Sequence, residues 1–102
     1  ELHTYSSLNG EFLKQYHDCM KNADEAIVFY SAHALEIKKM PPIPEELVRA
    51  SFGRDDLLVY TRKDNLVDYI INQKWGNKNL LMMSSGDFGG LDFKEFSEKL
   101  FS

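Results

Sequence analysis

The sequence is poor in cysteine, in long apolar runs and in excess positive charge. Its one cysteine, Cys19, has no internal partner, which argues against a secreted disulfide scaffold and favours a reducing, cytoplasmic compartment. No apolar run approaches the ~20 residues that span a membrane, so no membrane partner is expected. Lys and Arg number 12 against 16 Asp and Glu, and the resulting charge of −4 argues against a nucleic-acid partner.

What the sequence does contain is typical of one folded domain. Its 102 residues are 43% hydrophobic and 27% charged, which is not the composition of a disordered chain. A chain of this length buries roughly 65% of the surface that its unfolded form exposes, which is enough for one core. The opening residues, Glu1 to Ser7, resemble the end of a strand and a turn, so we expect a domain cut from a longer protein.

The hydrophobic period alternates between helical and strand-like spacing along the chain. From Gly10 to Asn22 the apolar residues fall on one stripe of a helix, which predicts a buried Cys19. A Pro-Glu-Glu start at Pro44 and a stop at Gly53 delimit a second helix. Further helices are predicted from Thr61 to Trp75 and over Phe93–Phe101, and buried strands at Ala26–Tyr30, Leu57–Tyr60 and Asn79–Met83.

This alternation predicts an α/β fold. Strands that are buried on both faces and joined by helices form parallel sheets with right-handed crossovers. We therefore expect a three-layer, Rossmann-like domain, with helices on both faces of a mostly parallel sheet of three or four strands. Because this sheet is small, we expect it to lack its first βα unit.

Several polar stretches follow the predicted strands and could form a binding site. In an open α/β sheet, ligands bind in the crevice at the carboxyl ends of the strands. The four stretches expected there are His3–Ser7, Ser31–His33, Thr61–Lys63 and Ser84–Gly90. The sequence therefore predicts one common rim, at which the polar ends of a peptide can be held.

The glycine-containing stretch Ser84–Gly90 is the most informative of the four. It follows a strand directly and precedes a helix, so its backbone N–H groups could point at an anionic ligand. It is neither a dinucleotide fingerprint nor a P-loop, because the chain has no G-x-G-x-x-G and no Gly-Lys-Ser/Thr ending. Simple tight strand-to-helix turns share this pattern and are the commoner case, so local sequence alone favours a structural turn over a binding loop.

The three histidines do not form a metal signature, because they lie far apart in the sequence. His3 and His33 follow predicted strands, where a positioned donor would be useful, although a solvated loop histidine is the simpler interpretation. No Ser-His-Asp order and no paired-carboxylate pattern stands out. We therefore assign no catalytic residue and no metal ligand.

Three ordered segments resemble the C-terminal domain of the Mur ligases, which build the peptide stem of bacterial peptidoglycan. They are HTYSSL from His3, ADEAIVFYSAHALE from Ala23 and NLLMMSSGDFGGLDFKEF from Asn79. The resemblance covers nearly all of residues 1–102, as a partial glutamate-ligase-like domain. Within the family, the murein peptide ligases have the most similar terminal loop, which reads Met-Ser-Asn-Gly-x-Phe-Gly-Gly-Ile.

The resemblance implies ATP-dependent amide bond formation, in which a UDP-N-acetylmuramate carboxylate is activated as an acyl phosphate and attacked by an amine. It implies ATP and Mg²⁺ as cofactors of the full-length enzyme, and N-terminal and central domains of the same chain as partners. The fragment alone is expected to hold no cofactor and to be inactive. The resemblance assigns substrate binding to Ser31, His33, Ser84, Ser85, Gly86 and Asp87, and a nucleotide- or anion-proximal turn to His3, Thr4 and Ser7.

At a few positions this sequence differs from the family pattern, and these differences bear on whether an amino acid or a peptide is the acceptor substrate. The relatives that add L-alanine have arginines where this chain has Thr4 and Ser7, so we favour a peptide acceptor and keep a UDP-N-acetylmuramate–L-alanine ligase as the alternative. Ser85 also stands where the murein peptide ligases have Asn. An alternative of another class is a stand-alone flavodoxin-like module that binds a ligand or a protein, which predicts a five-stranded sheet.

Overall fold

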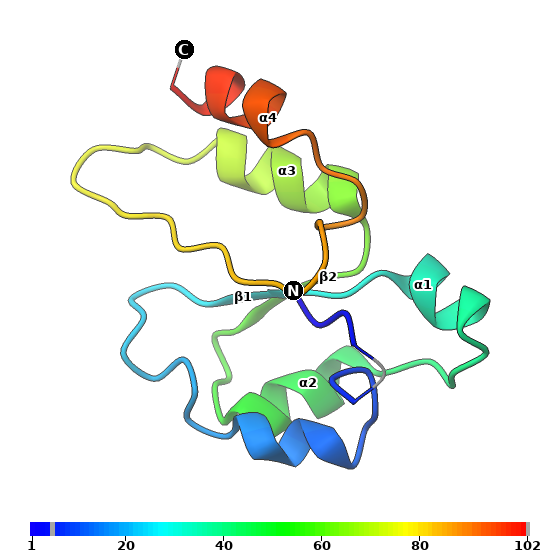
Figure 1. The fold of residues 1–102 in the computed structure, drawn as a ribbon. Coiled ribbons are helices and arrows are strands. Elements are labelled where there is room, and N and C mark those ends of the chain that lie inside the picture. Colours follow the sequence, from blue (N-terminus) through cyan, green and yellow to red (C-terminus); the bar gives the residue numbers. More distant parts are fainter. Residues whose placement is uncertain (5, 102) are drawn as a thin grey trace.

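A two-stranded parallel sheet lies at the centre of the computed structural model, which describes residues 1–4 and 6–101. β1 (Ile27–Phe29) pairs with β2 (Leu58–Tyr60), and Val28 lies opposite Val59. Helices lie on both sides of these strands, with α3 and α4 above them and α2 below them in Figure 1. The expected α/β class is therefore confirmed, on a smaller sheet than predicted.

The elements follow one another as helix–strand–helix units. Their order is η1 (Phe12–Tyr16, a 3₁₀ helix), β1, α1 (Ala32–Ile37), α2 (Glu45–Phe52), β2, α3 (Lys63–Ile71) and α4 (Phe93–Leu100). α2 has the predicted ends, because Pro44 precedes its first turn and Gly53 follows its last with a left-handed φ of 72°. Asp92 caps α4 by accepting a hydrogen bond from the Glu95 N–H.

Two apolar clusters form the core. Successive strand residues point to opposite faces, so Val28 belongs to one cluster and Phe29 to the other. The first cluster includes Leu13 of η1 and Val48 of α2, both 0% exposed. The second comprises Phe29, Leu66, Ile70, Phe88 and Phe96, which α3 and α4 help to supply. Both faces of the sheet are therefore covered.

The first two residues of the chain lie alongside β1. The Leu2 N–H donates to the Phe29 carbonyl at 2.9 Å, and the Glu1 ammonium donates to the Met83 carbonyl at 2.7 Å. Burial lowers the pKa of this ammonium, and the nearby Glu1 carboxylate opposes the shift. Glu1 and Leu2 therefore connect β1 to Met83, which lies 82 positions after Glu1 in the sequence.

The predicted third strand, Asn79–Met83, is not formed. This segment is extended without regular pairing, and Leu81 and Met83 are 80% and 69% exposed. The expected sheet of three or four strands is thus wrong for the described residues, which form two strands and no three-layer Rossmann-like domain. The physical reason is the absence of a neighbour, because a buried strand needs hydrogen-bonding partners that these residues do not meet.

The predicted helix from Gly10 to Asn22 is also wrong in extent. It ends at His17, whose ψ of 130° leaves the helical region, and Asp18 follows with a positive φ of 62°. Cys19 consequently lies on an exposed turn and not on a buried stripe. By contrast, α1 forms where the sequence pattern predicted no helix. No helix among the described residues has the length and apolarity needed to cross a lipid bilayer.

Arg54 connects the segment before β1 to the segment before β2 through hydrogen bonds of its guanidinium. Its guanidinium donates to the carbonyls of Met20 and Ala23 at 2.7 and 2.8 Å, and both residues lie before β1. It also pairs with Asp56, just before β2, through two hydrogen bonds of 2.8 Å. The hydrogen bond from Arg54 lowers the pKa of the Asp56 carboxyl.

Tyr69 provides a titration test of the contact between α3 and the segment before β1. Its hydroxyl donates to Glu25, and the carboxylate raises the pKa of Tyr69 to about 12. The folded chain holds this proton more tightly, so the contribution to stability is present below the unfolded pKa of about 10 and is lost as pH rises through about 12. We expect Glu25→Gln to lower the Tyr69 pKa towards 10, as followed by NMR of the labelled ring.

A suitable control for that titration is Glu11→Gln, which removes an equivalent charge from the exposed Glu11–Lys14 pair. It should leave the Tyr69 pKa unchanged. Equal Tyr69 pKa values in the wild-type chain and in Glu25→Gln would contradict the contact.

Candidate functional site

A shallow depression lies at the carboxyl ends of β1 and β2. Its volume is about 330 Å³. The lining residues are Phe29, Ser31, Ala32, His33, Thr61, Arg62, Lys63, Asp64 and Gly89. Three of the four stretches expected at this rim, Ser31–His33, Thr61–Lys63 and the end of Ser84–Gly90, therefore do meet.

Arg62 and Lys63 give one side of the depression a positive character. Arg62 is exposed and immediately precedes α3, without providing a side-chain cap for its first turn. The N–H groups of that turn and the two cationic side chains can therefore act on one anionic group. Asp64, in the same turn, is the one acidic residue of the lining.

Ser31 and His33 form the opposite side, at the start of α1. The Ser31 hydroxyl oxygen accepts a hydrogen bond from the Ala34 N–H at 3.1 Å, which caps the helix and leaves the hydroxyl proton to donate elsewhere. His33 is 79% exposed and lies 4.0 Å from the Glu36 carboxylate. Its imidazole can therefore reach a ligand from the rim without displacing a buried partner.

The terminal glycine loop reaches the depression only at Gly89. Gly89 has a positive φ of 72°, and a Cβ placed there would lie 3.7 Å from the Lys63 Cβ. The four residues assigned to substrate by resemblance, Ser84, Ser85, Gly86 and Asp87, do not line the depression. This part of the loop packs against the start of the chain instead.

Contacts with Glu1 and His3 hold that part of the loop. Ser84 donates to the Glu1 carboxylate, which also accepts from the Phe88 N–H at 3.0 Å. Gly86 has no room for a side chain, because a Cβ there would lie 2.7 Å from the His3 ring. Asp87 caps the following turn by accepting from the Gly90 N–H at 2.9 Å. Glycine at 86 is thus explained by packing against His3.

In the turn expected to lie near an anion, at His3, Thr4 and Ser7, the Thr4 and Ser7 side chains bond to each other. The Thr4 hydroxyl oxygen accepts from the Ser7 N–H at 3.1 Å and donates to the Ser7 hydroxyl at 3.0 Å. Ser7 is only 5% exposed, and Lys38 donates to the His3 carbonyl. These residues do not line the depression, and Tyr5, between them, lies outside the described residues.

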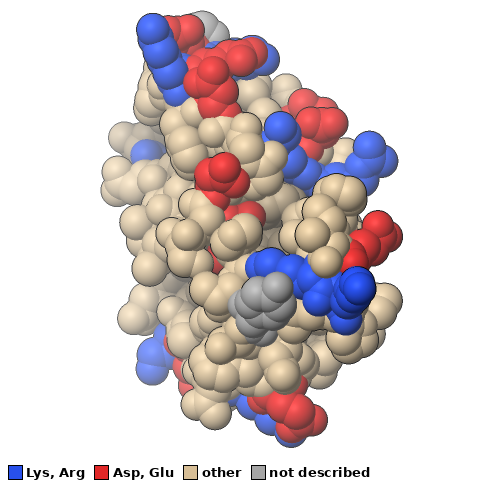
Figure 2. Space-filling view, turned by 45° about the vertical axis from the view of Figure 1, so that its right-hand side comes forward, with Lys and Arg blue, Asp and Glu red and all other residues tan. Residues whose placement is uncertain are grey.

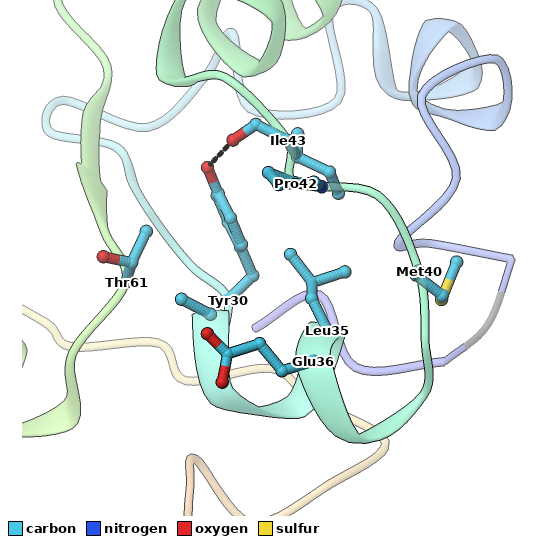
Figure 3. A pocket seen from close by; sticks show the side chains of 8 residues that line it. Tyr30, Leu35, Glu36, Met40, Pro42, Ile43 and Thr61 are labelled. Carbon is cyan, nitrogen blue, oxygen red and sulfur yellow. Dashed lines mark hydrogen bonds between the residues drawn. The ribbon is translucent and has the colours of Figure 1, made fainter.

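A second cavity of about 270 Å³ adjoins the depression, and the two share Ala32 and Thr61. Its other lining residues are Tyr30, Leu35, Glu36, Met40, Pro42 and Ile43. Figure 3 shows the Glu36 carboxylate on the side of Tyr30 and Thr61, with Leu35, Met40 and Ile43 around the rest of the wall. This cavity is mostly apolar, in contrast to the cationic depression beside it.

The Tyr30 hydroxyl fixes the wall of this apolar cavity. It donates to the Ile43 carbonyl at 2.5 Å, as drawn in Figure 3, and so ties the end of β1 to the segment before α2. Burial raises the pKa of Tyr30, and Glu45 and Glu46 raise it further. The hydroxyl therefore stays protonated and serves as a donor at neutral pH.

Sequence reasoning missed this cavity. The residues that line it lie around the helix-breaking pair Pro41–Pro42. Because the sequence there has no regular hydrophobic period, it predicted neither the short helix α1 nor the burial of Leu35 and Ile43. One signal was available, because Tyr30 ends a buried strand and a buried tyrosine hydroxyl needs a partner within reach.

The wider surface has no large area of one charge on the face drawn in Figure 2, where blue and red side chains are interspersed among broad tan areas. Among residues 1–4 and 6–101, no group of three or more His, Cys, Asp or Glu side chains could hold a metal ion. Comparisons with protein-family models, curated proteins and solved structures found no significant match to this chain.

Proposed function

We propose that this chain is the substrate-binding C-terminal part of a cytoplasmic, ATP-dependent peptidoglycan-precursor ligase of the Mur type. In this proposal it holds the peptide that is joined to UDP-N-acetylmuramate, and the N-terminal and central domains of the same protein supply the rest of the active site. The single observation that carries the proposal is the convergence of Ser31–His33, Thr61–Lys63 and Gly89 on one depression.

The chemistry of the depression suits the acceptor of such a reaction. A peptide acceptor carries carboxylates, for which Arg62, Lys63 and the uncapped first turn of α3 are suitable partners. Its amine attacks the acyl phosphate, and the exposed imidazole of His33 at the rim is a group that can hydrogen-bond to that amine. The domain would thus contribute orientation and charge stabilisation.

The residues of this chain do not fit ATP and Mg²⁺ on their own. The sequence has no P-loop, and the described residues include no cluster of metal-ligand side chains. In our proposal both cofactors therefore belong to the other domains, and no step assigned to this chain passes through them.

The acceptor is the part of the proposal that an assay decides most directly. The full-length enzyme is incubated with ATP, Mg²⁺ and UDP-N-acetylmuramate, and phosphate release is followed with each acceptor offered separately. We expect release with the tripeptide L-alanyl-γ-D-glutamyl-meso-diaminopimelate. Release only with free L-alanine would transfer the assignment to the L-alanine ligases. A full reading frame without an upstream G-x-x-x-x-G-K-[ST] motif would overturn the ligase proposal as a whole.

The flavodoxin-like alternative gains no support from the fold. It predicted a five-stranded sheet, whereas the described residues form two strands.

A further inference from the structure

We propose that the apolar cavity beside α1 binds a small primary ammonium compound with an apolar body, and that the Glu36 carboxylate is its counter-ion. The observation that carries this proposal is a single carboxylate on an otherwise uncharged and mostly apolar wall. The cavity adjoins the cationic depression but is lined by a different charged residue, so the proposal does not depend on the ligase function.

A reversal of the chain after α1 builds the cavity. Beyond the last turn of the helix, Lys39 has a left-handed φ of 55°, which residues other than glycine seldom adopt. The Met40 N–H then donates to the Leu35 carbonyl at 2.9 Å, which turns the following segment back against the helix. The Tyr30 hydroxyl holds the far end of this segment by donating to the Ile43 carbonyl. Two hydrogen bonds therefore fix the cavity wall, one at each end.

The size of the cavity limits the ligand to a small molecule. Its volume of about 270 Å³ equals the liquid volume of roughly nine water molecules, at about 30 Å³ each. Leu35 and Ile43, which are 4% and 9% exposed, supply apolar wall together with Met40 and Pro42 (Figure 3). A ligand with an apolar body and about eight non-hydrogen atoms is therefore of suitable size.

The charge of the wall selects a cation. Among the lining residues that the structure describes, Glu36 is the one with a charged side chain. Its carboxylate lies on the side of Tyr30 and Thr61 in Figure 3. His33 lies 4.0 Å from the same carboxylate but lines only the depression. A cation in the cavity would thus meet a carboxylate without competition from a cationic side chain of the wall.

The two hydroxyl groups of the wall also favour a ligand that donates hydrogen bonds. The Tyr30 hydroxyl already donates its proton to the Ile43 carbonyl, so its oxygen remains available only as an acceptor. The Thr61 hydroxyl, where the cavity meets the depression, can accept as well. A primary ammonium has three donors and no acceptor, whereas a carboxylate ligand would bring acceptors and negative charge to Glu36.

Titration with probes of similar shape and different charge tests the site. The labelled chain is titrated at neutral pH with benzylammonium chloride, benzyl alcohol or phenylacetate, and each Kd is taken from NMR chemical shifts. We expect benzylammonium to bind about fivefold more tightly than benzyl alcohol, because the Glu36 side chain is 81% exposed and its ion pair is screened by water. Phenylacetate should bind more weakly than either. Nuclear Overhauser effects should connect the benzylammonium ring to the methyl groups of Leu35 and Ile43.

A Glu36→Gln variant separates the counter-ion from the apolar wall. The substitution keeps the size of an exposed side chain, and it should reduce the preference for benzylammonium over benzyl alcohol from about fivefold to about one. Glu98→Gln is the matched control, because Glu98 is an exposed glutamate of α4 that lines neither cavity, and it should retain the preference.

Four results would overturn the proposal. They are the absence of a saturable shift below about 50 mM benzylammonium, equal binding of the three probes to the wild-type chain, a preference for benzylammonium that survives in Glu36→Gln, and Overhauser effects confined to residues of the depression. The last result would assign the probe to the neighbouring site and leave the apolar cavity without a ligand.

Discussion

Replacing Arg62 and Lys63 together by glutamate in the full-length ligase that we propose is expected to raise the KM for its proposed peptide acceptor by about 100-fold. Charge-assisted hydrogen bonds contribute about 1.5 kcal/mol each, and each 1.4 kcal/mol corresponds to about tenfold in binding. Both side chains line the depression beside the first turn of α3, so their reversal removes attraction and adds repulsion at the same place. The KM for ATP should change by less than about threefold, because ATP lies outside this chain in our proposal.

The matched control for this charge reversal is Lys14→Glu combined with Lys21→Glu. It produces the same change in net charge at two exposed lysines that line neither cavity. Its acceptor KM should stay within about threefold of the wild-type value. An acceptor KM that is unchanged in the Arg62/Lys63 variant, or raised equally in both variants, would remove the depression from the acceptor site.

Truncation of Leu13 to alanine is expected to lower the free energy of unfolding by about 3 kcal/mol. Leu13 is 0% exposed and lies in the cluster that joins η1 to α2, so the substitution leaves a cavity between these helices. Urea denaturation followed by circular dichroism gives the difference directly. A loss of less than about 1 kcal/mol would mean that η1 does not pack as described.

Leu81→Ala provides the matched control, because it deletes the same atoms from a side chain that is 80% exposed. Its effect should stay within about 0.5 kcal/mol in the 102-residue chain.

Local sequence signals were sufficient to predict the elements whose ends are marked by particular residues. Pro44 and Gly53 mark the two ends of α2. The apolar runs at β1 and β2 form strands that pair in parallel, as predicted. The prediction of one helix from Gly10 to Asn22, which rested on hydrophobic periodicity, was wrong. Periodicity does not reveal that the backbone leaves the helical conformation at His17 and Asp18. The segment 79–83 has the composition of a strand, but composition does not supply the neighbour that a strand requires.

The candidate site was predictable to a similar degree and for a similar reason. The carboxyl ends of parallel strands meet at one edge, so Ser31, His33 and the Thr61–Lys63 stretch were expected together, and the structure places them together. The position of Ser84–Asp87 depends on the packing of Gly86 against His3, a contact between residues far apart in sequence. Nothing in the local pattern of either segment indicates it.

The position of Arg54 has a consequence for how this small domain can evolve and move. One guanidinium joins the segments that lead into both strands, and the depression lies at the opposite end of the sheet. The contacts of Arg54 and the candidate binding site therefore lie at opposite ends of the strands. Substitutions around the depression can therefore be made while the contacts of Arg54 at the other end of both strands stay in place.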